Sequence, residues 1–200
     1  YAIISHADAQ IGRILETLKS SGLAENTLIV FSGDNGLAVG QHGLMGKQNL
    51  YEHSVGVPLI FSGPGIPAGR EQDAFCYLFD IYPTLCNAAG IGIPGSAEGK
   101  SLLPVITGES AGFRETLTFG YRNRQRSLRK GTLKLIEYAV DESRYTQLFD
   151  IKKDPLERVN LASQENESPE IKRALKEMRK LLAEQLTGYG DPFRESFTGG

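Results

Sequence analysis

The segment that decides the fold is Phe31-Ser-Gly-Asp-Asn-Gly-Leu-Ala-Val-Gly-Gln-His-Gly-Leu-Met-Gly-Lys47. It begins where an apolar run, residues 27–31, ends, and it places the oxygen-bearing side chains of Asp34 and Asn35 directly after that run. Glycine then recurs at short intervals as far as Lys47. Because glycine adopts positive φ without a steric penalty, this loop can turn sharply and approach a ligand closely. We interpret the segment as the rim of an active site.

The residues around this loop predict an α/β arrangement. Residues 2–20 carry apolar side chains at spacings of three and four, which predicts a helix with one buried face. Residues 27–31 and 57–61 are nearly continuous apolar runs, typical of strands covered on both faces in a parallel sheet. Residues 74–89 predict a further helix, which could restart with Asp80 as its cap and Pro83 in its first turn. Ligands of open α/β sheets lie outside the carboxyl ends of the strands, which is where Asp34 and Asn35 stand.

The sequence pattern changes after about residue 112. Short, partly alternating stretches at 116–121, 126–128, 132–138 and 147–150 predict an antiparallel sheet. An apolar stripe over residues 169–186, opposite Lys, Arg and Glu, predicts a terminal helix. The predicted fold class is therefore α/β over residues 1–112, a sheet flanked by helices, followed by a small α+β module over residues 113–200.

The composition describes an ordinary globular protein and excludes several classes of function. The 200 residues are 40% hydrophobic and 23% charged, with a net charge of −2 and a pI near 6.0, so no basic surface calls for nucleic acid or an anionic membrane. No apolar run approaches the roughly 20 residues of a membrane span, and no signal segment opens the chain. Cys76 and Cys86 are spaced unlike a zinc pair and are interpreted as buried hydrophobic residues. Tyr1 opens directly onto a helical pattern, so we expect a piece of a longer protein.

A series of motifs stands in a fixed order along the chain: Ser32-Gly33-Asp34-Asn35-Gly36, Gly40-Gln41-His42-Gly43, Gly46-Lys47, Tyr51-Glu52, Val57-Pro58-Leu59-Ile60, Asp80-Ile81-Tyr82-Pro83-Thr84-Leu85 and Leu148-Phe149-Asp150. This ordered set resembles the sulfatase family, the type I, formylglycine-dependent sulfuric ester hydrolases of the alkaline phosphatase superfamily. The similarity covers essentially the whole chain. It implies that residues 1–112 belong to an alkaline-phosphatase-like sheet and that the chain is the C-terminal portion of a larger enzyme. It further implies a small-molecule or glycan sulfate ester as substrate and a periplasmic or secreted location.

The resemblance assigns roles to four residues. Asp34 and Asn35 match metal ligands, and their carboxylate and amide oxygens suit Ca²⁺ better than Zn²⁺, which favours nitrogen and sulfur. Taken alone, Asp-Asn-Gly is equally typical of a turn. Lys47 matches the lysine that contacts the sulfate, although an isolated loop lysine is usually a solvated charge. His42 could donate to the substrate or serve in acid/base chemistry, or simply pack within the loop.

The family's nucleophile has no counterpart in this sequence. Formylglycine arises from Cys or Ser within Cys/Ser-x-Pro-x-Arg, whereas Cys76 precedes Tyr77-Leu78 and Cys86 precedes Asn87-Ala88. We therefore expect the nucleophile and further Ca²⁺ ligands upstream, and we expect this chain alone to be inactive and inclined to self-associate. Two alternatives stay open: a phosphodiesterase or phosphonate hydrolase of the same superfamily, or a non-catalytic module that binds a sugar or a partner.

Overall fold

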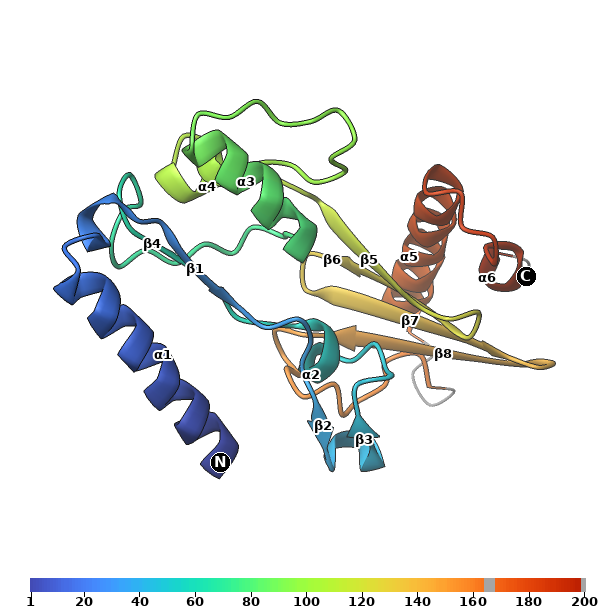
Figure 1. Ribbon diagram of the computed structural model, residues 1–200. Helices are drawn as coiled ribbons and strands as arrows, with labels where there is room; N and C mark the ends of the chain where they lie inside the picture. The colour runs from blue at the N-terminus through green and yellow to red at the C-terminus, as the bar shows by residue number, and fades with distance from the viewer. Residues whose placement is uncertain (164–167, 199–200) are drawn as a thin grey trace.

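The computed structural model describes residues 1–163 and 168–198 (Figure 1). The helices are α1 (Ala2–Ser20), α2 (Glu52–Val55), α3 (Ile81–Ala88), α4 (Leu103–Thr107), α5 (Pro169–Gly188) and α6 (Glu195–Thr198). The strands are β1 (Ile29–Ser32), β2 (Ala38–Val39), β3 (Met45–Gly46), β4 (Leu59–Ser62), β5 (Thr116–Tyr121), β6 (Gln125–Lys130), β7 (Leu133–Val140) and β8 (Ser143–Asp150). Within the described residues the strands pair as β1 with β4, β2 with β3, and β5–β6–β7–β8 in sequence order.

The four-stranded sheet confirms the antiparallel sheet predicted for the second half of the chain. Each strand is antiparallel to the next, and short turns connect them. The turns after β6 and β7 pass through Gly131 and Asp141, both at positive φ, which matches the twist that tight hairpins require. Successive side chains of a strand point to opposite faces, so this sheet presents two distinct surfaces.

One surface of the sheet forms the main core together with α5. Three leucines in register across the strands pack against one stripe of α5: Leu128, Leu135 and Leu148 against Met178, Leu182 and Leu186, all almost completely buried. The helix begins with Pro169 in its first turn, where a missing N–H costs nothing, and the Ser168 hydroxyl accepts a bond from the Ile171 N–H at 3.3 Å. The predicted terminal helix is thus confirmed.

The opposite surface carries the segment that leads into α2. Ile136 follows Leu135 and therefore points away from α5, and it packs with Phe149 against Leu50 and Tyr51. Figure 1 shows α2 between the β1–β4 pair and the four-stranded sheet. This packing connects the first half of the chain to the sheet in its second half.

The prediction of parallel strands covered on both faces is wrong for β1 and β4. The two strands pair antiparallel, with Phe31 opposite Ile60, and these side chains are 41% and 56% exposed. The Ser32 hydroxyl secures the end of β1 by donating to the Pro58 carbonyl at 2.8 Å. A run of apolar residues indicates a strand but does not encode its direction, which depends on the path of the connecting chain.

Two helical predictions also require correction. Helix α1 has the predicted length but buries no residue, with Ile3 86% and Ile4 69% exposed. The helix predicted over residues 74–89 starts only at Ile81, after a 3-10 turn at Leu78–Asp80. The Asp80 carboxylate accepts bonds from the Tyr77 and Lys100 N–H groups, and this holds residues before the turn out of the helix. No helix in the described ranges is both long and apolar enough to cross a membrane.

Candidate functional site

The turn after β1 presents the two predicted metal ligands. Asp34 Oδ1 accepts a bond from the Asn35 N–H at 2.9 Å, and Asn35 Nδ2 donates to the Gly36 carbonyl at 3.0 Å. Asp34 is exposed and Asn35 is half-buried. These bonds within the turn use Asp34 Oδ1 and Asn35 Nδ2. Asp34 Oδ2 and Asn35 Oδ1 therefore accept no hydrogen bond from the turn.

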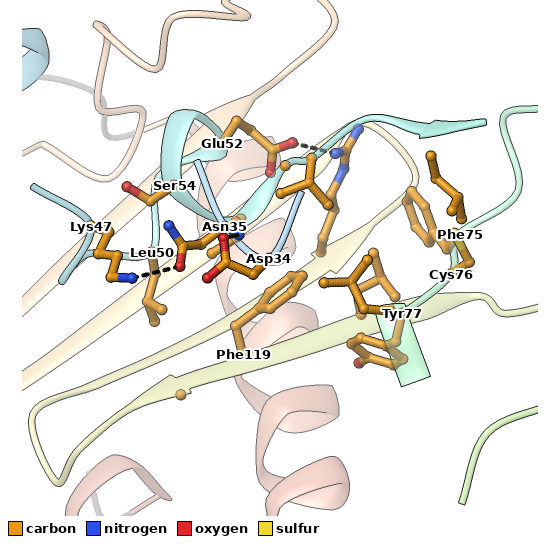
Figure 2. Close-up of a pocket in the computed structure, with 18 of the residues that line it drawn as sticks. Asp34, Asn35, Lys47, Leu50, Glu52, Ser54, Phe75, Cys76, Tyr77 and Phe119 are labelled. Carbon is orange, nitrogen blue, oxygen red and sulfur yellow. Dashed lines mark hydrogen bonds and ion pairs between the residues drawn. The ribbon is translucent and has the colours of Figure 1, made fainter. Parts of the chain in front are cut away.

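The β2–β3 hairpin returns the chain to this turn and delivers Lys47. Ala38 pairs with Gly46 in the hairpin, so Lys47 emerges beside the residues that precede β2. Its Nζ donates a hydrogen bond to Asn35 Oδ1 at 3.0 Å across twelve positions of sequence (Figure 2). The structure therefore brings together three of the four predicted site residues, Asp34, Asn35 and Lys47.

A cavity of about 550 Å³ lies against this group. Its polar wall is formed by Asp34, Asn35, Lys47, Asn49, Glu52 and Arg129, and its opposite wall by apolar and aromatic residues, among them Phe75, Cys76, Tyr77, Leu117, Phe119 and Tyr121. Figure 2 shows Asp34 between Asn35 and the ring of Phe119. An apolar pocket with a few charged groups on one side is the usual form of a small-molecule site.

The thiol in this cavity is not set up as a nucleophile. Burial raises the pKa of Cys76, and the nearby Asp80 charge adds to that effect. A raised pKa favours the neutral thiol, whereas nucleophilic cysteines need the thiolate. The raised pKa of Cys76 thus agrees with the sequence, in which Cys76 lacks the neighbouring residues that formylglycine formation requires.

His42 lies within the glycine-rich loop but does not line the cavity. Its backbone has a positive φ of 53°, and its ring stacks on Tyr51 with centroids 3.8 Å apart and planes 4° apart. Its Nε2 is 3.1 Å from the Leu156 carbonyl oxygen. In this position the ring packs against Tyr51, and a role of His42 in acid/base chemistry or substrate binding stays a prediction.

His53 lies beside the rings of His42 and Tyr51, with its ring centroid 5.7 Å from that of His42. Its ring centroid lies 5.6 Å from that of Tyr51, and its Nε2 is buried without a hydrogen-bond partner among the described residues. Burial lowers the pKa of His53, with smaller contributions from the charges of His42 and Lys134. The imidazole is therefore held in its neutral form more strongly than a free histidine.

Sequence reasoning missed a group of charged residues next to the site, two of which, Glu52 and Arg129, also line the cavity. The Glu52 carboxylate accepts bonds from Arg129 at 2.6 Å and from Lys134 at 2.9 Å, and Glu157 lies 2.9 Å from Lys134. A signal was present in the sequence, because Lys134 interrupts a strand whose neighbours are apolar. A buried lysine is rare unless it is paired, so its partners were the missing information.

The predicted metal-binding residues offer the kind of ligand atom that a hard cation prefers, but they are too few to complete its coordination shell. Asp34 and Asn35 supply only oxygen atoms, which suits Ca²⁺, an ion that takes six to eight oxygen ligands. Within residues 1–163 and 168–198 no group of three or more His, Cys, Asp or Glu side chains is placed to hold a metal ion. The described chain can therefore contribute part of a Ca²⁺ shell and would need further ligands to complete it.

Comparison of the sequence with known proteins identifies a family. Residues 40–185 match the family model described as N-sulphoglucosamine sulphohydrolase, C-terminal. Arylsulfatase K of Mus musculus is 35% identical over 187 residues, which is 88% of this chain and 33% of that protein. N-acetylglucosamine-6-O-sulfatase of Bacteroides thetaiotaomicron is 31% identical over 202 residues, 95% of this chain and 35% of that protein. The chain spans about a third of the length of these curated relatives.

Solved structures agree with the sequence comparison. One, of a protein in complex with its substrate D-glucosamine-2-N,6-O-disulfate, has a TM-score of 0.84 at 30% identity, covering 94% of this chain and 40% of that one. A phosphonate monoester hydrolase from Silicibacter pomeroyi has a TM-score of 0.70 at 28% identity, covering 87% of this chain and 38% of that one. The chain belongs to the sulfatase family and corresponds to its C-terminal region.

Proposed function

We propose that the protein containing this chain hydrolyses sulfate esters, and that Asp34, Asn35 and Lys47 form one edge of its active site. The observation that carries this proposal is the contact of 3.0 Å between Lys47 Nζ and Asn35 Oδ1, beside Asp34, on the rim of the cavity. This contact joins two residues that the family motif singles out and that lie twelve positions apart in the sequence, which supports the proposal. Curated relatives of this chain carry the names of sulfatases that act on aryl sulfates and on sulfated sugars.

Lys47 would contact a sulfate oxygen in this scheme. A sulfate monoester repels an approaching nucleophile with its own negative oxygens, and charge grows on the departing alcohol as the S–O bond breaks. A fixed cation near those oxygens lowers both barriers without accepting a proton. Lys47 is exposed and has one side-chain partner in the structure, Asn35, so its ammonium retains donors for a ligand.

Asp34 and Asn35 would hold a divalent cation, most simply Ca²⁺. When bound, that ion would supply positive charge to the sulfate and hold it in place. The oxygen ligands of this turn match its preference, and the rest of its shell would come from residues outside this chain. The nucleophile would come from outside as well, since neither Cys76 nor Cys86 stands in the required motif.

The aromatic wall of the cavity favours the alcohol portion of the ester as its occupant. Phe119 and Tyr121 of β5 face the polar edge across the cavity, and aromatic faces pack well against aryl groups and the apolar faces of sugars. We propose an aryl sulfate or a sulfated carbohydrate as the substrate. The supporting facts are this wall and the sulfated glucosamine bound to a structural relative.

Two variants of the full-length protein test this assignment with an aryl sulfate substrate. Lys47→Ala and Asp34→Ala are expected to lower kcat/KM by on the order of 10²-fold or more, as the loss of a preorganised charge at a reaction centre does. Lys153→Ala is the matched control, because this lysine is largely exposed and does not line the cavity. Unchanged kcat/KM in both site variants would refute the assignment.

A second function is favoured by one observation. The phosphonate monoester hydrolase from Silicibacter pomeroyi shares this fold at a TM-score of 0.70. The same cation, amide and lysine would stabilise a phosphoryl group as well as a sulfuryl group. Parallel assays with matched aryl sulfate, phosphodiester and phosphonate monoester substrates distinguish the two, and faster turnover of a phosphorus ester would replace the sulfatase proposal.

A further inference from the structure

Two basic side chains lie opposite each other on neighbouring strands of the four-stranded sheet. Arg129 of β6 pairs with Lys134 of β7, so both point to the sheet surface that faces α2. Like charges directly opposite each other destabilise a sheet. Lys134 is also completely buried, where an unpaired ammonium would be very costly. This pair therefore depends on anions supplied by another part of the chain.

Glu52, the first residue of α2, supplies the bridging anion. Its Oε2 accepts from Arg129 at 2.6 Å and its Oε1 accepts from Lys134 at 2.9 Å, so one carboxylate joins both strands. Glu157 adds a second carboxylate, with Oε1 2.9 Å from Lys134 Nζ and Oε2 accepting the Glu52 N–H at 2.6 Å. We call Glu52, Arg129, Lys134 and Glu157 the ionic anchor. The positive charges of its two basic residues equal the negative charges of its two carboxylates.

Glu157 is held in an unfavourable state by this arrangement. Its φ of 54° lies in the left-handed region, which residues with a side chain rarely adopt. It is only 2% exposed, and burial raises the pKa of its carboxyl against the opposing effect of Lys134. Strain of this kind persists where surrounding contacts determine the geometry, and it often marks a functional constraint. The remaining question is what the ionic anchor constrains.

Helix α2 transmits the position of Glu52 to the turn that carries the site. The Gly36 N–H donates to the Ser54 carbonyl at 2.9 Å, and a Cβ on Gly36 would collide with the His53 carbonyl oxygen. Gly36 directly follows Asn35, whose side chain accepts the bond from Lys47. A series of contacts thus runs from the sheet through α2 to the polar edge of the cavity. Figure 2 shows Glu52 at one end of this series and the contact between Lys47 and Asn35 at the other.

We propose that the ionic anchor sets the position of the Asp34, Asn35 and Lys47 edge, with Lys134 as a positioning residue that never touches the substrate. Arg129 and Lys134 of the sheet bind Glu52, which is the first residue of α2. The Ser54 carbonyl of α2 in turn accepts a hydrogen bond from the turn at Gly36. The inference rests on the proposed function for what this edge binds. The mechanical coupling itself is a property of the described chain and can be measured without any turnover.

Hydrogen exchange in the full-length protein tests the coupling directly. Lys134→Met leaves Glu157 buried without its cation and leaves Glu52 paired with Arg129 alone. Exchange of the amides over residues 33–47 is expected to rise by about tenfold or more. Arg126→Met is the matched control. Arg126 is a buried cation of β6 that points to the other surface of the sheet and pairs with Asp191 at 2.6 Å. Its loss is expected to destabilise the fold without selectively releasing residues 33–47.

Kinetics supply the second readout. Lys134→Met is expected to lower kcat for an aryl sulfate by on the order of 10²-fold, as small misplacements at a reaction centre do, with a much smaller change in KM. Equal loosening of residues 33–47 in Lys134→Met and Arg126→Met would overturn the proposal, because it would indicate global destabilisation. Unchanged exchange in folded Lys134→Met would overturn it as well.

Glu157→Gln keeps the test decisive if Lys134→Met fails to fold. Glutamine retains one oxygen for the Glu52 N–H, but it removes the charge and leaves an amide NH2, which cannot accept a bond, facing Lys134. A selective rise in exchange over residues 33–47 is therefore expected. Glu177→Gln is its control, since Glu177 pairs with Lys130 on the exposed surface. Identical exchange in the two variants would refute the coupling. A wild-type protein without sulfatase activity would refute the proposed function alone, because the exchange experiment still decides the coupling.

Discussion

The ammonium of Lys47 donates a hydrogen bond to Oδ1 of Asn35, the oxygen that the family motif assigns to a metal ion. An amide oxygen has two lone pairs, so both cations can share it, but their positive charges repel. Occupancy of the metal site would therefore push the ammonium away from Asn35 and toward the cavity. The Lys47 to Asn35 bond is expected to respond to the metal.

This relationship predicts that removing the Lys47 charge tightens Ca²⁺ binding while it damages catalysis. Lys47→Met in the full-length protein is expected to raise Ca²⁺ affinity several-fold, because a like charge beside the ion is lost. Titration calorimetry measures the affinity, and Lys153→Met at a remote exposed position controls for net charge. Weaker Ca²⁺ binding in Lys47→Met than in this control would contradict the assignment of Asn35 as a ligand.

The isolated 200-residue chain is expected to bind Ca²⁺ weakly and to lack sulfatase activity. Asp34 and Asn35 provide far fewer oxygen atoms than the six to eight that the ion takes, and no residue of the sequence stands in the formylglycine motif. Calorimetry of the chain alone checks the first expectation, and a single-turnover assay with an aryl sulfate checks the second. Tight binding or measurable turnover would show that the chain holds more of the site than we assign to it.

Gly36→Ala is expected to disrupt the site turn. The added Cβ would meet the His53 carbonyl oxygen, and neither backbone can yield without displacing α2, so a loss of about 1–3 kcal/mol in the free energy of unfolding is expected. Gly12→Ala provides the control. Gly12 lies inside α1 with open space around it, and alanine there is expected to stabilise the helix by about 0.5–1 kcal/mol. Urea unfolding measures both changes, and similar effects of the two substitutions would argue against the close approach at Gly36.

The stability of the protein is expected to fall in mild acid because of His53. Burial lowers the pKa of His53 from its ordinary value of 6.5, so the unfolded state binds more protons than the folded state as the pH drops. Stability is therefore complete above pH 6.5 and decreases as the pH falls through 6.5 toward the lowered pKa. Thermal unfolding between pH 7.5 and 5 should show a shallower decline for His53→Gln than for wild type, with the exposed His6→Gln as control. An equal decline in all three proteins would exclude this role of His53.

Local sequence patterns anticipated much of the fold. The alternation of residues 116–150 predicts strands that the structure shows as β5 to β8, and the stripe of α5 predicts the helix that covers them. These predictions succeed because the period of a strand or a helix is a local property. The antiparallel direction of β4 against β1 escaped prediction, because contacts with distant residues decide it. The sequence does predict a restart of the helix at Asp80, and α3 begins directly after Asp80.

Some residues of the candidate site were likewise predictable from local sequence, and others were not. Asp34, Asn35 and Lys47 could be found from the ordered motifs, and the structure brings them together. The ionic anchor could not be found, because Lys134 meets Glu52 and Glu157 only through long-range packing.

Short motifs and local spacing are enough to identify the family, the periodic elements and the residues at the cavity rim. Tertiary contacts are needed to establish that β1 and β4 run antiparallel, that His42 stacks on Tyr51, and that a buried lysine of β7 binds the first residue of α2. The physical reason is the range of the forces involved. Backbone propensity acts between neighbours in sequence, whereas the burial of a charge is tolerated only where distant segments bring its partners.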